Sequence, residues 1–154
     1  ESATNAHFKG SIDFTILARE NDAKATITAT LQNSIIKLTT TEYFRNYFAQ
    51  GATLKLSTTQ QTTITVDTTV AGSEDQILFV TPGTTLYLEG EGVKQDPGNG
   101  ATPTVTFSKQ AIGTTTAMTQ TTVEVDANDA GGSEVTVTLD DTFTEINTQE
   151  IDLN

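Results

Sequence analysis

The decisive stretch for the fold is Ala25-Thr26-Ile27-Thr28-Ala29-Thr30-Leu31, in which apolar residues and threonine alternate without interruption. Successive side chains of a β-strand point to opposite faces of its sheet, so strict alternation is typical of a strand with one buried face and one solvated face. Strands of this kind occur mainly in antiparallel sheets. The stretch therefore predicts antiparallel β-structure.

The same period of two continues along most of the chain. Threonine, a β-branched residue that favours strands, accounts for 33 of the 154 residues. Turn-forming sequences rich in Gly, Pro, Asn and Asp separate the alternating runs. The pattern predicts an all-β fold, an antiparallel β-sandwich of immunoglobulin-like or transthyretin-like type with about 8–10 strands. The runs include Phe8/Ile12/Phe14/Ile16, Ile36/Leu38, Leu54/Leu56, Ile64/Val66, Leu86/Leu88, Val105/Phe107, Val123/Val125 and Val135/Val137/Leu139.

One segment has a helical period instead. Four aromatic residues recur at i, i+1, i+4 and i+5, which places them on one side of a helix: Tyr43, Phe44, Tyr47 and Phe48. Thr40 or Thr41 can cap the first turn, and Gly51 can end the helix in the left-handed conformation. We therefore expect one short inserted helix near residues 41–50. Phe44 and Phe48 are expected in the core, and Tyr43 and Tyr47 nearer the surface.

A continuous apolar run, Ile77-Leu78-Phe79-Val80, also departs from the alternation. It predicts a central strand buried on both faces, or the point where a strand changes sheets.

The organisation of the chain is expected to have three parts. Residues 1–33 form an N-terminal strand hairpin, which could be the end of a preceding module. Residues 34–141 form the β-sandwich module. Residues 142–154 form a C-terminal strand or a linker.

Charge and composition exclude several functions. The chain has 8 basic and 20 acidic residues, a formal charge of −12, which disfavours nucleic acid and anionic lipid headgroups. It has no cysteine, which excludes disulfides and thiolate chemistry. No apolar stretch approaches 18 residues, so we expect no direct insertion of this chain into a membrane.

The side chains that catalysis would need are scarce, so we expect no enzymatic activity. His7 is the only histidine and lies near the N-terminus, without the Gly-x-Ser-x-Gly motif of a hydrolase. Paired carboxylates could support glycoside hydrolysis, but alternating polar positions on strands produce such pairs routinely. The pairs are Glu89/Glu91, Glu124/Asp126 and Asp140/Asp141.

No cofactor is expected, with one alternative for a metal. Asp126, Asn128 and Asp129 resemble the start of a calcium loop, but position five is Ala130 and position twelve is Val137. A calcium site at these residues is therefore an alternative to a plain acidic hairpin loop.

Exposed tyrosines are the candidate ligand-binding side chains. Tyr43, Tyr47 and Tyr87 could stack against sugar rings if they reach solvent. The competing interpretation is that the aromatic helix closes one end of the sandwich.

Several segments, in this order, resemble a domain-of-unknown-function family of β-sandwich modules in Bacteroides cell-surface lipoproteins, which is fimbrillin-like in general character. The resemblance implies an extracellular location facing outward from the outer membrane, with a lipid anchor upstream of Glu1, and no activity of the module's own. It identifies no catalytic or binding residue. The segments are Gly10–Ile16, Ala25–Asn33, Ile35–Leu38, Tyr43–Phe48, Thr81–Leu88, Val105–Lys109 and Asp126–Asp141.

The expected function is therefore that of a structural or adhesive surface module. A glycan-binding module for polysaccharide capture is the first alternative, and a glycoside hydrolase accessory or catalytic domain is the second. The expected partners are other surface proteins or glycans, and the oligomeric state stays open.

Overall fold

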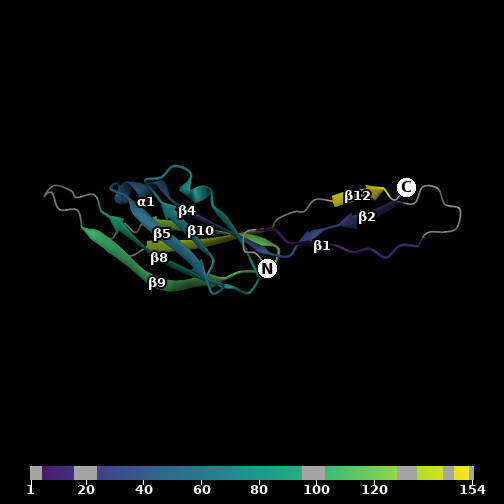
Figure 1. Ribbon diagram of the computed structural model, residues 1–154. Helices are drawn as coiled ribbons and strands as arrows, with labels where there is room; N and C mark the ends of the chain where they lie inside the picture. Colours follow the sequence, from purple (N-terminus) through teal and green to yellow (C-terminus); the bar gives the residue numbers. More distant parts are fainter. Residues whose placement is uncertain (1–4, 16–23, 95–102, 128–134, 144–147, 153–154) are drawn as a thin grey trace.

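A computed structural model describes residues 5–15, 24–94, 103–127, 135–143 and 148–152. It has a β-sandwich at one end and a narrow arm of strands at the other (Figure 1). The elements of the arm are β1 (Phe8–Lys9), β2 (Lys24–Thr28), β3 (Thr30–Leu31) and β12 (Thr148–Asp152). The elements of the sandwich are β4 (Ser34–Thr40), α1 (Glu42–Tyr47), β5 (Ala52–Thr58), β6 (Thr63–Asp67), the 3-10 turn η1 (Ser73–Asp75), β7 (Ile77–Val80), β8 (Thr85–Val93), β9 (Thr104–Thr114), β10 (Thr119–Ala127) and β11 (Val135–Phe143).

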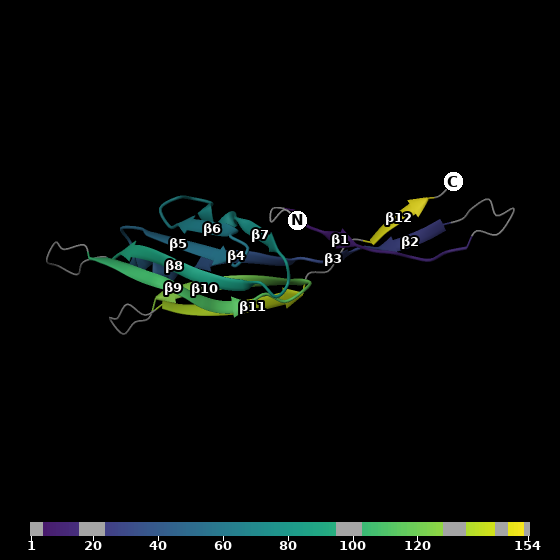
Figure 2. The same ribbon diagram turned by 60° about the horizontal axis from the view of Figure 1, so that its bottom comes forward.

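Two four-stranded sheets form the sandwich, with strand orders β11-β10-β4-β7 and β6-β5-β8-β9 (Figure 2). The prediction of an all-β sandwich with one short helix is confirmed. One pairing was not predicted, because β10 runs parallel to β4 with Val123 in register with Leu38. Parallel neighbours need a long connection. Here that connection passes through the whole second sheet, from β5 to β9.

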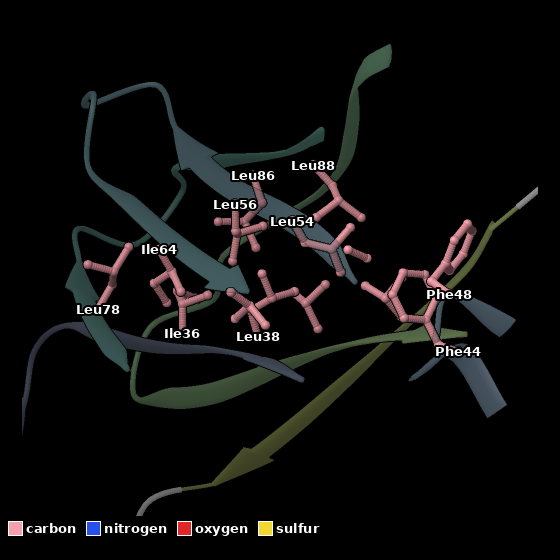
Figure 3. Close-up of a cluster of buried hydrophobic side chains, with 14 of the residues drawn as sticks. Ile36, Leu38, Phe44, Phe48, Leu54, Leu56, Ile64, Leu78, Leu86 and Leu88 are labelled. Atoms are coloured by element: carbon pink, nitrogen blue, oxygen red, sulfur yellow. The ribbon is translucent and has the colours of Figure 1, made fainter. Parts of the chain in front are cut away.

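The core lies between the two sheets and contains the residues that the alternation predicted. Leucine, isoleucine and valine side chains from β4, β7 and β10 face those from β5, β6 and β8 (Figure 3). The best-buried members include Ile36, Leu38, Leu54, Leu56, Ile64, Val66, Leu86, Val123 and Val125.

The helix closes one end of this core, as predicted. Thr41 caps α1, and its hydroxyl accepts a hydrogen bond from the Phe44 amide at 3.0 Å. Gly51 follows with a φ of 110°, in the region that favours glycine, so the chain can turn into β5. Phe44 and Phe48 are buried with ring centroids 4.8 Å apart, and Figure 3 shows them together at the end of the core.

The expectation that Ile77–Val80 forms a central strand was wrong. Among the described strands, β7 lies at the edge of its sheet with β4 as its one neighbour, and Ile77 is half exposed. The alternative expectation, that the run marks the point where the chain changes sheets, agrees better with the structure. The chain leaves this sheet directly after β7, and β8 belongs to the other sheet. A run of four apolar residues does not distinguish an edge strand from a central one.

The arm continues the strand that enters the sandwich as β4. In the arm the odd-numbered residues Ala25 and Leu31 are buried, whereas in β4 the buried residues are even-numbered, from Ser34 to Thr40. The change occurs at Gln32 and Asn33, between β3 and β4. There Asn33 is buried, and its side-chain oxygen accepts a hydrogen bond from the His7 amide at 2.5 Å.

Both ends of the described chain pair inside the arm. β1 pairs antiparallel with β3, with Phe8 opposite Leu31. β12 pairs antiparallel with β2, with Ile151 opposite Ala25. The described part of the C-terminal segment is therefore a strand that returns to the first hairpin.

Candidate interaction surface

The exposed face of α1 carries only one accessible aromatic ring. Tyr43 is 43% exposed. Tyr47 is half-buried: its ring lies 6.3 Å from Tyr43 and 5.0 Å from Phe48, and the Lys94 ammonium sits 4.8 Å from its centroid. Its hydroxyl is buried without a hydrogen-bond partner in the described part of the chain. The helix therefore offers one ring to a ligand, because Tyr47 is held inside a stack.

Tyr87 lies on the outer face of the second sheet and is half-buried. The Lys109 ammonium stands 4.9 Å from its ring centroid, a cation–π contact that occupies the ring. Tyr87 comes from β8 and Tyr43 from α1, so the three predicted tyrosines do not form one platform. Of the three predicted tyrosines, Tyr43 alone has an exposed ring that could stack on a sugar.

A polar hollow of about 330 Å³ lies beside β5, between β6 and β8. Two carboxylates line it, Asp67 of β6 and Glu91 of β8. In the sheet register both residues lie opposite Thr53 of β5, one on each neighbouring strand. Asp67 accepts hydrogen bonds from the Thr69 hydroxyl at 2.6 Å and from its amide at 2.9 Å, and these bonds lower the pKa of Asp67. A general acid needs the opposite shift. Asp67 is therefore held as a carboxylate.

The Thr69 hydroxyl is the larger cause of this shift, so Thr69→Val should raise the pKa of Asp67 toward its ordinary value of 3.8. Because the pKa of Asp67 is lower in the folded state than in the unfolded state, its carboxylate stabilises the fold at pH values above 3.8. This stabilisation is lost as the pH falls through the folded pKa. An NMR titration of the Asp67 carboxyl carbon measures the change. The control is Thr65→Val, at an exposed threonine of β6, the strand that contains Asp67. An unchanged pKa in Thr69→Val would contradict the assignment.

The other predicted groups do not gather into one site. The Asp126 carboxylate accepts hydrogen bonds from the Thr41 hydroxyl and from the Ala127 amide. Asn128 and Asp129 lie outside the described residues. Within the described ranges no three His, Asp or Glu side chains are placed to hold a metal ion.

The remaining carboxylates and the histidine are also separate. Glu89 forms an ion pair with Lys55 at 3.3 Å, and Glu124 is exposed. His7 is exposed on the arm. The side chains of Asp140 and Asp141 lie outside the described part.

The arm has the largest set of exposed apolar side chains in the described structure. Phe8 is 48% exposed, Ile12 is 44% exposed and Phe14 is 50% exposed. We call these three residues the apolar stripe. Ser11, Asp13, Thr26 and Thr28 occupy the alternate positions and are also exposed. The arm is therefore an amphipathic ribbon with a polar face and an apolar face.

The chain after β1 stays beside β2, as both views of the ribbon show (Figure 1, Figure 2). A Cβ at Gly10 would lie 2.5 Å from the Thr28 carbonyl oxygen and 3.0 Å from the Ile27 side chain. Only glycine allows this close approach of the two backbones.

Sequence reasoning did not identify the apolar stripe as a surface. The alternation of Phe8, Ile12 and Phe14 was interpreted as the buried face of a strand. Alternation shows that residues share a face, but it does not show whether another layer covers that face.

These features define the class of protein as an all-β sandwich with an amphipathic β-arm. The chain belongs to the family described as Domain of unknown function (DUF4493), whose sequence model matches residues 1–154. No curated protein and no solved structure matches the chain. Among the described residues there is no helix with the length and hydropathy needed to cross a membrane.

Proposed function

We propose that this chain is a non-enzymatic structural or adhesive module of a surface protein, and that the arm is its contact element. The observation that carries the proposal is the half-exposed apolar stripe of Phe8, Ile12 and Phe14 on a ribbon that projects from the sandwich (Figure 1). Soluble domains seldom place several large apolar side chains on one exposed face unless that face meets a partner. The partner is another surface protein.

The proposed location is the outer membrane of a Bacteroides-type cell, facing outward and anchored by a lipid upstream of Glu1. The support for this location is the ordered set of segments that resemble Bacteroides surface lipoproteins of fimbrillin-like character. The threonine-rich strands and the net charge of −12 agree with an extracellular β-protein.

Retention of coated beads tests the proposal. Beads that carry the chain should stay on a surface coated with outer-membrane proteins and should wash off a surface coated with polysaccharide. Phe8→Ser combined with Phe14→Ser should remove most of this retention, because serine lacks the apolar surface.

The matched control is Val70→Ser combined with Ile77→Ser. It removes two apolar side chains of similar exposure, 54% and 49%, from the sandwich, and it should leave retention unchanged. Retention on the protein surface that survives the arm substitutions would mean that the arm is not the contact element.

Glycan capture is the second candidate, and the exposed ring of Tyr43 favours it. A glycan array with the purified chain tests this function, with Tyr43→Ala as the variant and Tyr47→Phe as the control. Binding to one glycan class that Tyr43→Ala abolishes would replace the adhesive function by capture. A blank array would remove the capture function.

A further inference from the structure

We propose that the arm is held in one direction relative to the sandwich, and that two buried polar residues where it joins the sandwich, Asn33 and Ser34, hold it there. We call the hydrogen bonds of these two side chains the root contacts. The inference deepens the proposed function and rests on it in one respect, because a contact element with a fixed direction presents the apolar stripe already oriented. The root contacts belong to the chain alone, so they can be tested without a partner.

The need for such contacts comes from the break between β3 and β4. Leu31 is buried at an odd-numbered position and Ser34 at an even-numbered one, so the chain changes faces by one residue between the two strands. A regular strand alternates with a period of two, so its ladder does not continue through a shift of one residue. Without further contacts, the arm would pivot at this point.

Asn33 supplies the contact on the side of the arm. It is 8% exposed, and its Oδ1 accepts a hydrogen bond from the His7 amide at 2.5 Å. The Gln32 amide donates to the His7 carbonyl oxygen at 2.7 Å. His7 directly precedes β1, so these two bonds extend the pairing of β1 with β3 beyond the pair Phe8 and Leu31. The Asn33 side chain thus provides an acceptor where the ladder has ended.

Ser34 supplies the contact on the side of the sandwich. It is the first residue of β4 and is fully buried, on the same face as Ile36 and Leu38. Its hydroxyl donates a hydrogen bond to the Thr116 carbonyl oxygen at 2.5 Å. A buried polar group that is hydrogen-bonded favours the one arrangement in which its partner is in place. Ser34 therefore ties the start of β4 to the turn between β9 and β10.

The turn that Ser34 contacts is itself held by hydrogen bonds. The Thr116 carbonyl oxygen also accepts a bond from the Thr119 hydroxyl at 2.8 Å. The neighbouring Thr115 is buried, its amide donates to the Thr84 carbonyl oxygen at 3.0 Å, and its hydroxyl oxygen accepts from the Thr84 amide at 3.1 Å. The β7–β8 and β9–β10 turns are thus joined at the end of the sandwich where the arm is attached.

Two contacts at neighbouring residues determine a direction, whereas one contact leaves a rotation about itself. Asn33 is bonded to the segment that enters the arm as β1, and Ser34 is bonded to the sandwich. The ribbon shows the arm continuing away from the sandwich at this place (Figure 1, Figure 2). The geometry therefore favours a fixed arm over a swinging one.

Distance measurements between two spin labels test the inference. The chain has no cysteine, so Thr26→Cys on the arm and Thr65→Cys on the sandwich introduce the labels at two exposed positions. Double electron–electron resonance then gives the distribution of the distance between them. We expect one narrow distance in this labelled chain. A broad distribution would mean that the arm swings, and it would overturn the inference.

Two substitutions remove the root contacts one at a time. Asn33→Leu removes the acceptor at similar volume, and Ser34→Ala removes the donor. Loss of one buried hydrogen bond should lower the ratio of fixed to swinging conformations roughly 5-fold or more, which adds a broad component to the distribution.

Each substitution has a matched control. Ser57→Ala removes the hydroxyl of another buried serine, which has no hydrogen-bond partner among the described residues, so the distribution should stay narrow. Asn33→Asp keeps an acceptor for the His7 amide and should also stay narrow. Circular dichroism confirms that each variant retains its β-structure.

The outcomes separate this inference from the proposed function. Broadening in Asn33→Leu and Ser34→Ala with narrow controls supports the root contacts. Unchanged distributions in both variants, broadening in only one of them, or equal broadening in a control overturns the two-contact arrangement. The measurement uses no partner, so such a result leaves bead retention as the test of the proposed function. A fixed arm without arm-dependent retention would contradict the proposed function and leave the inference standing.

Discussion

Replacing Phe44 by alanine is expected to lower the free energy of unfolding by about 3–5 kcal/mol, the usual loss for a buried phenylalanine. Phe44 is fully buried, and its ring lies 4.8 Å from the Phe48 ring and 6.4 Å from the Phe107 ring. Helix α1 has only six residues, too few to be stable alone, so it depends on this anchor. Urea denaturation followed by circular dichroism measures the loss.

The control is Tyr43→Ala, one residue earlier in the same helix. Most of its effect should come from the stacking on Tyr47, so we expect a loss of about 1 kcal/mol or less. Equal losses in the two variants would contradict the assignment of Phe44 as the core-facing residue.

Replacing Val123 by aspartate is expected to be more severe and to abolish folding at neutral pH. Val123 is fully buried in β10, where it is in register with Leu38 of β4 and Leu139 of β11. Among the described residues no lysine, arginine or histidine is buried, so the core offers the new carboxylate no counter-ion. An uncompensated buried charge costs about 3–5 kcal/mol or more, which approaches the whole stability of a small domain.

Thr122→Asp is the matched control for this substitution. It adds the same charge one residue earlier, on the other face of β10, where the register places it between Lys37 of β4 and Asp140 of β11, so that an attraction and a repulsion oppose each other. We expect a change within about 0.5 kcal/mol. Thermal unfolding of both variants checks the pair. Similar melting temperatures would mean that the alternation in β10 does not separate core from surface.

The candidate site shows where sequence reasoning succeeded and where it stopped. The helical period around Phe44 placed Phe44 and Phe48 in the core and Tyr43 at the surface, and all three placements are confirmed. Tyr47 was expected nearer the surface, but the Lys94 ammonium and two aromatic rings hold it half-buried. The helical period shows to which side of the helix the Tyr47 side chain points. It does not show which residues cover that side chain, and one of them, Lys94, is distant in the sequence.

The sequence by itself determined the strands, the short helix and the parity of the core residues, because these follow from local alternation and from turn-forming residues. Only the tertiary structure decided that β7 is an edge strand, that β4 and β10 run parallel, and that Phe8, Ile12 and Phe14 stay exposed. These properties depend on which strands meet in space and on whether a second layer covers a face. Contacts of that kind join segments far apart in the chain, and a pattern of nearest neighbours does not encode them.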